Sequence, residues 1–466
     1  MHQDALQLSL RTLQVTRLLQ ALGFQVNSQK SQTLKCQALT FLGFIINTQI
    51  MRIQLPLEKK EQILAQIRFL LTTPRISPRE LSQIIGKLNA TVLAVFPAPL
   101  HYRALQRLRR VALRRGSYDV VVSWTPAAME ELRWWEKNLL HWNGRPLHDD
   151  KIALVIQSDS SLLRWGAVCR GVYIGQPWLP QDRALHINEL KAAILALQTF
   201  ARGLKQGCVL IQMDNTGAIT AINKLGSARS LTLFSFAHQM WFWCFQKGLT
   251  VRAEHIPGRM NIQADWASRV DLDSSSWKLD PCQFNKISYL WGPFQTDLFA
   301  DFTNFQIPHF YSWKPDPCSQ GIDAFTKDWN SEINYAFPPF CLVGKCIQKI
   351  QQATTTLVLI APVWPAQTWY PSLLQALVDQ PRLIPHHPRL LLNNAHLGHP
   401  LILSGGLRLA AWKVSSNTKL RSRFRHTLPH SSVQHGVSQQ ERLIVRAGAG
   451  GLAGVLNNKL IHFIPL

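Results

Sequence analysis

The sequence contains few acidic residues and no long apolar run. Only 27 of its 466 residues are Asp or Glu, against 50 Lys and Arg, which gives a formal net charge of +23. No segment reaches the roughly 18 uninterrupted apolar residues that a membrane-spanning helix needs. The sequence therefore predicts a soluble protein, and the excess of positive charge indicates a polyanionic partner such as nucleic acid.

Cysteine is also scarce and gives no sign of a metal or disulfide framework. The eight cysteines are scattered, with neither a Cys-x-x-Cys pair nor a His/Cys spacing typical of zinc sites. The first residues lack the charged and then apolar layout of a secretory signal. We therefore expect free thiols and an intracellular protein, in the nucleus or the cytoplasm.

The length and the hydrophobic content predict several α/β domains. With 46% hydrophobic residues, 466 residues can build more than one core. Residues 1–117 carry 17 Lys and Arg against 4 Asp and Glu, more than half of the net charge, and mostly follow helical spacing. Four tryptophans mark a helical connection over residues 118–150.

A stripe of arginines is predicted on one helix of the basic segment. Arg103, Arg107, Arg110 and Arg114 are spaced by 4, 3 and 4 residues, so they share one face of a helix. Such a stripe is often only a solvated face, but no acidic residue lies between these four. We therefore favour contact with nucleic-acid phosphates.

Residues 151–271 have the texture of a mixed sheet covered by helices. The predicted order is a strand, a two-stranded hairpin about Gly171, a helix, a strand, two helices, a strand and a last helix. The predicted elements are, in order, 152–156, 165–169, 172–176, 187–203, 209–213, 216–224, 231–247, 249–254 and 261–269.

Four acids occupy special positions on these elements. Asp159 and Asp214 each end a predicted strand, Glu189 lies in the first turn of a helix, and Asp265 lies in the last helix. Each acid alone is explained as a helix cap or a favourable charge at a helix N-terminus. Together they predict a cluster of hard oxygen ligands for Mg²⁺ or Mn²⁺, and two such ions suit the hydrolysis of a phosphodiester.

His255 stands ten residues before the last of these acids and completes a recognisable set of motifs. The motifs SDSS (158–161), NELKA (188–192), MDNTGA (213–218) and HIPGRMNIQADWASR (255–269) resemble the type 1 ribonuclease H domain of retroelements. The resemblance implies that Asp159, Glu189, Asp214 and Asp265 are catalytic and hold two Mg²⁺ ions. It also implies that His255 lies on a mobile loop and assists proton transfer or product release.

The flanking segment 1–117 resembles the end of a reverse transcriptase palm and the following thumb. The similar motifs are GFQVNSQKS (23–31), FLGFIIN (41–47), IIGKLNA (84–90) and PAPLHYRALQR (97–107). This resemblance implies that Lys30 and the hairpin at Phe41 to Phe44 lie near primer or incoming nucleotide. No Tyr-x-Asp-Asp motif occurs in the sequence, so we expect no polymerase activity.

Beyond the nuclease motifs, the chain resembles the adenine-methyltransferase-like domain of DIRS-type (tyrosine-recombinase) retrotransposons. The similar motifs are DLFAD (297–301), IDAFTKDW (322–329), YAFPPF (335–340) and LVLIAPVWPAQTWY (357–370). Methyl transfer to an amine needs a polar group directly before the Pro-Pro-aromatic motif, whereas this chain has Phe337 followed by Pro338, Pro339 and Phe340. We therefore do not expect S-adenosylmethionine as a cofactor, and favour a role in binding or scaffolding.

These interpretations combine into a multidomain α/β fold with a central ribonuclease H-like mixed sheet, a mostly helical N-terminal part and a Rossmann-like C-terminal part. The expected function is metal-dependent cleavage of the RNA strand of RNA–DNA hybrids, with no membrane partner. The alternative is a catalytically inactive nucleic-acid-binding relic of a retrotransposon. The predicted boundaries are 1–117 reverse transcriptase remnant, 118–150 connection, 151–271 ribonuclease H-like domain, 272–290 linker, 291–413 methyltransferase-like domain and 414–466 basic, disordered tail.

Overall fold

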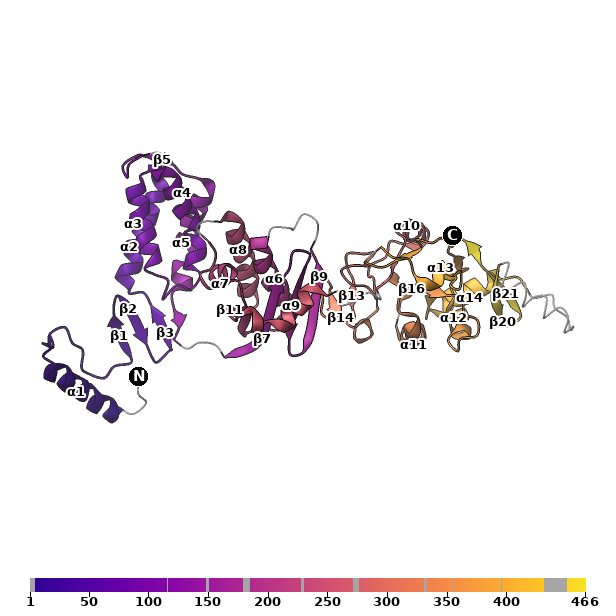
Figure 1. The fold of residues 1–466 in the computed structure, drawn as a ribbon, viewed down its shortest axis with the longest axis horizontal. Coiled ribbons are helices and arrows are strands. Elements are labelled where there is room, and N and C mark those ends of the chain that lie inside the picture. Colours follow the sequence, from indigo (N-terminus) through magenta and orange to yellow (C-terminus); the bar gives the residue numbers. More distant parts are fainter. Residues whose placement is uncertain are drawn as a thin grey trace. The chain divides into compact units, whose positions relative to one another are not determined.

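The computed structural model covers most of the chain, and Figure 1 traces its elements. The described residues are 5–114, 116–147, 151–178, 185–227, 230–270, 276–330, 333–353, 355–394, 396–430 and 451–466. The chain divides into two compact units, Met1–Val155 with Leu204–Ile256, and Ile156–Gly203 with Pro257–Leu466. No helix within these described ranges is long and apolar enough to cross a membrane.

The N-terminal part of the first unit is a helical bundle beside a small sheet. Ser77 caps α3 through a reciprocal capping box with Glu80, and Thr125 caps α5, so both helices begin where the sequence supplies a hydroxyl. Their buried faces share one apolar core with α2 and α4. The bundle and its flanking elements are α1 (Ala5–Ala21), β1 (Ala38–Phe41), β2 (Phe44–Asn47), β3 (Arg52–Gln54), α2 (Leu57–Thr72), β4 (Arg75–Ile76), α3 (Pro78–Asn89), α4 (Arg103–Leu113), β5 (Val122–Ser123), α5 (Pro126–Trp142) and β6 (Arg145–Pro146).

The predicted mixed sheet is present, with its strands in the order β11-β10-β7-β8-β9. Along the chain, strands and helices follow the predicted succession, so the mixed α/β organisation of this region is confirmed. The hairpin turns at Arg170 and Gly171, both at positive φ, as the right-handed twist of two-residue hairpins requires. The elements are β7 (Ile152–Ser160), β8 (Arg164–Cys169), β9 (Val172–Pro177), α6 (Leu185–Phe200), β10 (Gly207–Met213), α7 (Thr216–Asn223), α8 (Leu231–Gln246), β11 (Leu249–His255) and α9 (Ile262–Arg269).

The C-terminal part of the second unit has a sheet of its own, in the order β15-β16-β19-β17-β22. β15 and β16 are parallel, whereas β19 runs antiparallel to β16, so the sheet is mixed. Residues 296–300 hydrogen-bond to β15 on one side and to residues 309–311 on the other. The elements are β12 (Lys278–Leu279), α10 (Pro281–Trp291), β13 (Tyr311–Ser312), β14 (Gly321–Ile322), β15 (Ile333–Ala336), α11 (Val343–Gln352), β16 (Thr356–Pro362), α12 (Tyr370–Ala376), β17 (Arg382–Leu383), β18 (Leu391–Leu392), α13 (Pro400–Leu403), β19 (Leu409–Ser415), α14 (Thr418–Thr427), β20 (Leu452–Leu456), β21 (Lys459–His462) and β22 (Ile464–Pro465).

Two predicted boundaries in this part are wrong. The expected linker 272–290 contains most of helix α10, which buries Phe284 and Ile287 in an apolar core. The expected disordered tail 414–466 contains the end of β19, helix α14 and strands β20 to β22, because Phe424 and Ile461 belong to the core packed around Trp412. The basic composition of the tail obscured these few apolar anchors. Residues 271–275 of the linker and 431–450 of the tail lie outside the described residues.

A half-buried imidazole in the helical bundle generates a pH dependence. The ring of His101 stacks on Trp134 with 3.6 Å between the centroids, and burial, together with the neighbouring His238, lowers the pKa of His101 from 6.5 to about 3. The unfolded chain therefore binds a proton below about pH 6.5 that the folded bundle does not bind. Stability is present above this pH and is lost as the pH falls toward 3.

We predict that acidification from pH 7 to pH 5 lowers the opening free energy of α4 and α5 by about 2 kcal/mol through this histidine. His101→Phe keeps a ring against Trp134 and removes this contribution. Burial raises the pKa of Glu131 of α5 to about 7, which acts in the opposite direction, so the share of His101 is the difference in pH slope between the variant and the unaltered chain. Hydrogen–deuterium exchange of peptides from the two helices measures both. An unchanged pH slope in the variant would contradict the assignment to His101.

Candidate active site

Three of the predicted acids come together at one edge of the five-stranded sheet. Asp159, Glu189 and Asp214 each offer a carboxylate oxygen, and these oxygens lie within 4.8 Å of one another. Asp159 is the penultimate residue of β7, Glu189 lies in α6, and Asp214 follows β10, the strand next to β7 in the sheet. Asp159 and Glu189 are 30 residues apart in the sequence, and Glu189 and Asp214 are 25 apart. The fold therefore brings distant residues into one acidic cluster.

The cluster fits a hard divalent cation. Asp159 is 7% exposed, Glu189 is half-buried and Asp214 is exposed. The cluster therefore extends from the protein interior to the solvent. Three carboxylates at this spacing repel one another unless a cation neutralises them. Oxygen-only donors favour Mg²⁺ or Mn²⁺ over metals that prefer nitrogen or sulfur. The side chains present thus suit the predicted metal, with the solvent-facing side left for a substrate.

Two polar residues that the sequence analysis did not single out hold the buried end of this cluster. Ser268 donates its hydroxyl to Oδ2 of Asp159 at 2.6 Å, and Asn261 donates its side-chain amide to the carbonyl of Ser158 at 3.0 Å. Asn261 and Ser268 are both buried. They lie in the same motif as His255 and Asp265, six residues after the first and three after the second, so their proximity in sequence to these residues was the available signal.

The fourth predicted acid, Asp265, is not in the group of three. On α9 its Oδ1 accepts hydrogen bonds from Nε and Nη2 of Arg269, at 2.8 and 2.6 Å, one helical turn away. The hydrogen bond with Asp265 raises the pKa of the Arg269 guanidinium. Asp265 therefore forms a local ion pair with Arg269 and lies outside the group of three.

His255 occupies a different setting from the one expected. It is the last residue of β11, in register with Met213 of β10, and the N–H of Ile256 continues the pairing by bonding to the carbonyl of Met213 at 3.0 Å. The expectation of a loop position is therefore wrong: the imidazole projects from the end of a strand. Its exposed side chain stands on the strand next to the one that leads into Asp214.

Helix α9 lies so close to the sheet that only glycine fits beneath it. A Cβ added at Gly166 of β8 would lie 2.2 Å from the backbone nitrogen of Ser268, and one added at Gly175 of β9 would lie 2.4 Å from the carbonyl of Ala267. Ala264 and Ala267 are the buried residues of α9 over these glycines. This close approach sets the height of Ser268 over Asp159.

Two members of the predicted arginine stripe contact residues outside α4. Nη2 of Arg103 bonds to the carbonyl of Lys224 at 2.8 Å, and the guanidinium of Arg107 lies 4.8 Å from the ring centroid of Phe234. Burial lowers the pKa of both Arg103 and Arg107. These two side chains contact the α7–α8 region, and their contact with phosphates stays a prediction.

The remaining predicted binding residues lie elsewhere. Arg114, just after α4, is exposed, and Arg110 is half-buried on that helix, so phosphate contact stays a prediction for these two. Lys30 is exposed in a turn, where its backbone N–H donates to Oδ1 of Asn27. The motif from Phe337 to Phe340 follows β15 and lines a cavity in the second unit.

Comparisons with known proteins give distant similarities only. No family model and no curated protein matches the sequence. The chain is similar to the foamy viral protease-reverse transcriptase solved with an RNA/DNA hybrid, at 18% identity and a TM-score of 0.28, over 55% of this chain and 34% of that one. A structure of the viral protein with double-stranded DNA is 19% identical at a TM-score of 0.27, over 55% of this chain and 45% of that one. Ribonuclease H1 of Halobacterium salinarum is 17% identical at a TM-score of 0.21, over 24% of this chain and 91% of that one. The chain thus spans less than half of either viral protein.

We predict that Gly166→Ala destabilises the sheet by about 1 to 3 kcal/mol, because the added methyl group must push the backbone of α9 outward. The matched control is Gly203→Ala, where an added Cβ meets nothing within 4 Å. Urea unfolding of both variants measures the difference. Equal stability of the two variants would contradict the close contact between α9 and β8.

Proposed function

We propose that the region from β7 to α9 is a metal-dependent endonuclease that hydrolyses the RNA strand of RNA–DNA hybrids. The proposal depends chiefly on the meeting of Asp159, Glu189 and Asp214 within 4.8 Å. The same three acids stand in motifs that resemble type 1 ribonuclease H, which adds the reaction and the substrate to what the carboxylates alone support.

We assign different roles to these side chains according to their exposure and their hydrogen-bond partners. Asp159, buried and fixed by Ser268, is the rigid ligand, while Asp214 faces solvent and can adjust to a substrate phosphate. Two bound Mg²⁺ or Mn²⁺ ions would supply an activated water and stabilise the leaving oxygen of the phosphodiester. Asp265 would complete the ligand set after leaving Arg269, and His255 would pass a proton between solvent and the departing sugar oxygen.

The substrate class follows from charge and from the chemistry of the cut. A net charge of +23 favours a polyanion, and its attraction to phosphates does not depend on base sequence. The 2′-hydroxyl distinguishes an RNA strand from a DNA strand at the scissile position. Arg110 and Arg114 are the members of the arginine stripe that we propose to contact phosphate.

For the flanking parts we propose the origin that their motifs resemble, a DIRS-type retroelement. The N-terminal part would be a reverse transcriptase remnant that helps to hold the hybrid, without polymerase activity. The C-terminal part would be a methyltransferase-like module that binds or scaffolds rather than transfers methyl groups, because Phe337 offers no acceptor for an amine hydrogen.

One observation favours the alternative, a catalytically inactive relic that binds nucleic acid. The fourth acid, Asp265, is paired with Arg269 and is not one of the three acids that come together. If this pair persists when substrate and metal are present, the chain would bind a hybrid without cutting it.

We predict that the full chain cleaves a labelled RNA–DNA hybrid in the presence of Mg²⁺, with cuts in the RNA strand only and none in EDTA. Asp214→Asn should reduce cleavage to the EDTA level while hybrid affinity stays within about twofold, because phosphate contacts supply most of the binding. Glu254→Gln removes the neighbouring charge of an exposed residue on β11, outside the group of three, and should retain activity.

Three results separate the two functions. Loss of binding together with cleavage in Asp214→Asn would count against its assigned role. Equal loss in Glu254→Gln would show that net charge, and not the cluster, governs cleavage. Tight binding without cleavage by the unaltered chain would establish the relic and refute the nuclease.

A further inference from the structure

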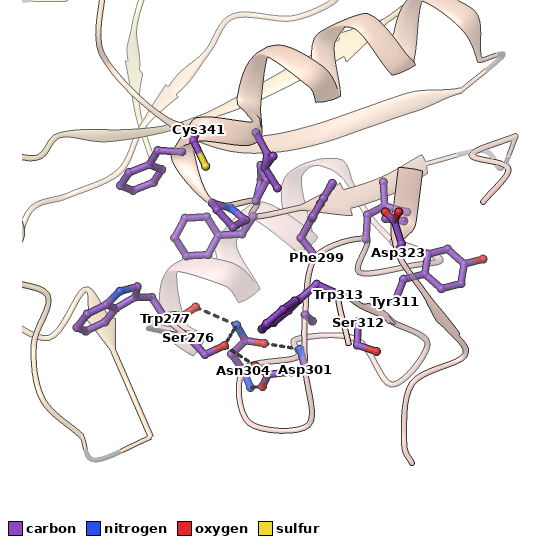
Figure 2. A pocket seen from close by; sticks show the side chains of 18 of the residues that line it. Ser276, Trp277, Phe299, Asp301, Asn304, Tyr311, Ser312, Trp313, Asp323 and Cys341 are labelled. Carbon is purple, nitrogen blue, oxygen red and sulfur yellow. Dashed lines mark hydrogen bonds between the residues drawn. The ribbon is translucent and has the colours of Figure 1, made fainter. Parts of the chain in front are cut away.

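The second unit contains a cavity that the proposed nuclease does not use. Its volume is about 600 Å³, in the range of pockets that hold small organic groups. Figure 2 shows that side chains from separate segments surround it, among them Phe299, Asp301, Asn304 and Trp313. Phe337 and Phe340, from the motif after β15, line it as well.

The position of the cavity in the sheet is one that favours ligands. Residues 297–300 lie between residues 310–311 and β15, and all three run parallel. After residues 297–300, the chain first forms the neighbouring segment 310–311 on one side and then β15 on the other side. Cavities outside the carboxyl ends of strands at such a switch point are the usual ligand sites of open α/β sheets. The lining residues Asp301, Ser312 and Phe337 come directly from these ends.

The walls of the cavity are aromatic, and one aromatic residue is exposed at its rim. Phe299 packs edge-on against Phe325 at 5.3 Å, and Phe340 packs edge-on against Trp364 at 5.4 Å, so these rings are fixed by their neighbours. Trp313 is 69% exposed although it lines the same cavity. A tryptophan in this position adds nothing to the core, but it offers a flat surface on which a planar ring can stack.

The polar side of the cavity is a carboxylate set in a rigid network. Asp301 is 6% exposed and accepts hydrogen bonds from the hydroxyls of Ser276 and Thr303. Asn304 closes the network by accepting from the N–H of Asp301 at 2.7 Å and donating to Ser276 at 3.0 Å. Oδ1 also accepts from the backbone N–H of Thr303 at 2.7 Å and is therefore filled. Oδ2 accepts from Ser276, so its second lone pair can still accept from a hydroxyl placed in the cavity.

Positive charge lies at the rim and not inside. The described residues that line the cavity include no lysine or arginine, but two carboxylates, Asp301 and the exposed Asp323, so a phosphate has no cationic partner among them. Lys314, next in sequence to the rim residue Trp313, places its Nζ 4.9 Å from the centre of the indole ring. Lys327 lies beside Gly321 and the ring of Tyr311, another lining residue. A ligand that fits this charge pattern has a planar, uncharged part inside and phosphates outside.

We infer that this cavity binds one unpaired nucleotide of a single-stranded RNA. The base stacks on Trp313 and the phenylalanine walls, the ribose 2′-hydroxyl donates to Asp301, and the phosphates remain at the rim beside Lys314. The site is separate from the carboxylate cluster and does not depend on the proposed nuclease activity. The inference gives the C-terminal part a binding role. The apolar side chain of Phe337, which lines the cavity, suits this role.

The test uses the full chain in EDTA and a short RNA that carries one 5-iodouridine, whose photocrosslinking favours stacked aromatic rings. After irradiation, mass spectrometry maps the crosslinked peptides. We expect a crosslink at Trp313 or Phe299. Trp313→Ala should lower the yield at this cavity about fivefold or more, and Trp313→Phe, which keeps a ring, should restore most of it. The matched control Tyr289→Ala removes a 95% exposed aromatic of α10 and should leave the yield unchanged.

A 2′-deoxy sugar at the iodinated position should lower the crosslink yield several-fold, because it removes the donor to Asp301. Crosslinks confined to residues outside the cavity would overturn the inference. Equal losses in Trp313→Ala and Tyr289→Ala would overturn it as well, because they would indicate a nonspecific effect. Binding of free uridine in the cavity without any RNA crosslink there would assign the cavity to a small molecule instead.

Discussion

The mutual repulsion of three carboxylates is the constraint on which the centre of this structure depends. Asp159, Glu189 and Asp214 lie within 4.8 Å, an arrangement that is unfavourable in the absence of a cation. The surrounding fold keeps it in place by hydrogen-bonding the buried acid to Ser268 and by seating α9 on Gly166. A rigid acidic site in a chain of net charge +23 then attracts cations locally while the chain as a whole attracts polyanions.

The elements around the site were predictable because they depend on local sequence. Alternating apolar residues located β7 to β11, and acids at strand ends indicated a shared edge of the sheet. The contacts that hold the acids in place were not predictable, because they join residues far apart in the sequence. Ser268, which donates its hydroxyl to Asp159, is 109 positions away from it. Spacing likewise placed Arg103 and Arg107 on one helix face, but it could not reveal that this face packs on Lys224 and Phe234.

In the C-terminal part, too, contacts between distant residues could not be predicted from the sequence. Its basic composition after residue 414 suggested disorder, whereas Ile461 and Phe424 are buried around the sheet. The Pro-Pro-aromatic motif was visible in the sequence, but the cavity that it helps to line depends on Asp301 and Trp313 from other segments. The chain thus has an acidic cluster that suits a divalent cation and a separate cavity with aromatic walls.

The central claim is that the three carboxylates form one divalent-cation site. Titration of the full chain with Mn²⁺, followed by the decrease of the free-ion electron paramagnetic resonance signal, tests it without requiring activity. The account predicts saturable binding that is lost in the double variant Asp159→Asn with Glu189→Gln. Equal Mn²⁺ binding by the unaltered chain and this variant would contradict the account.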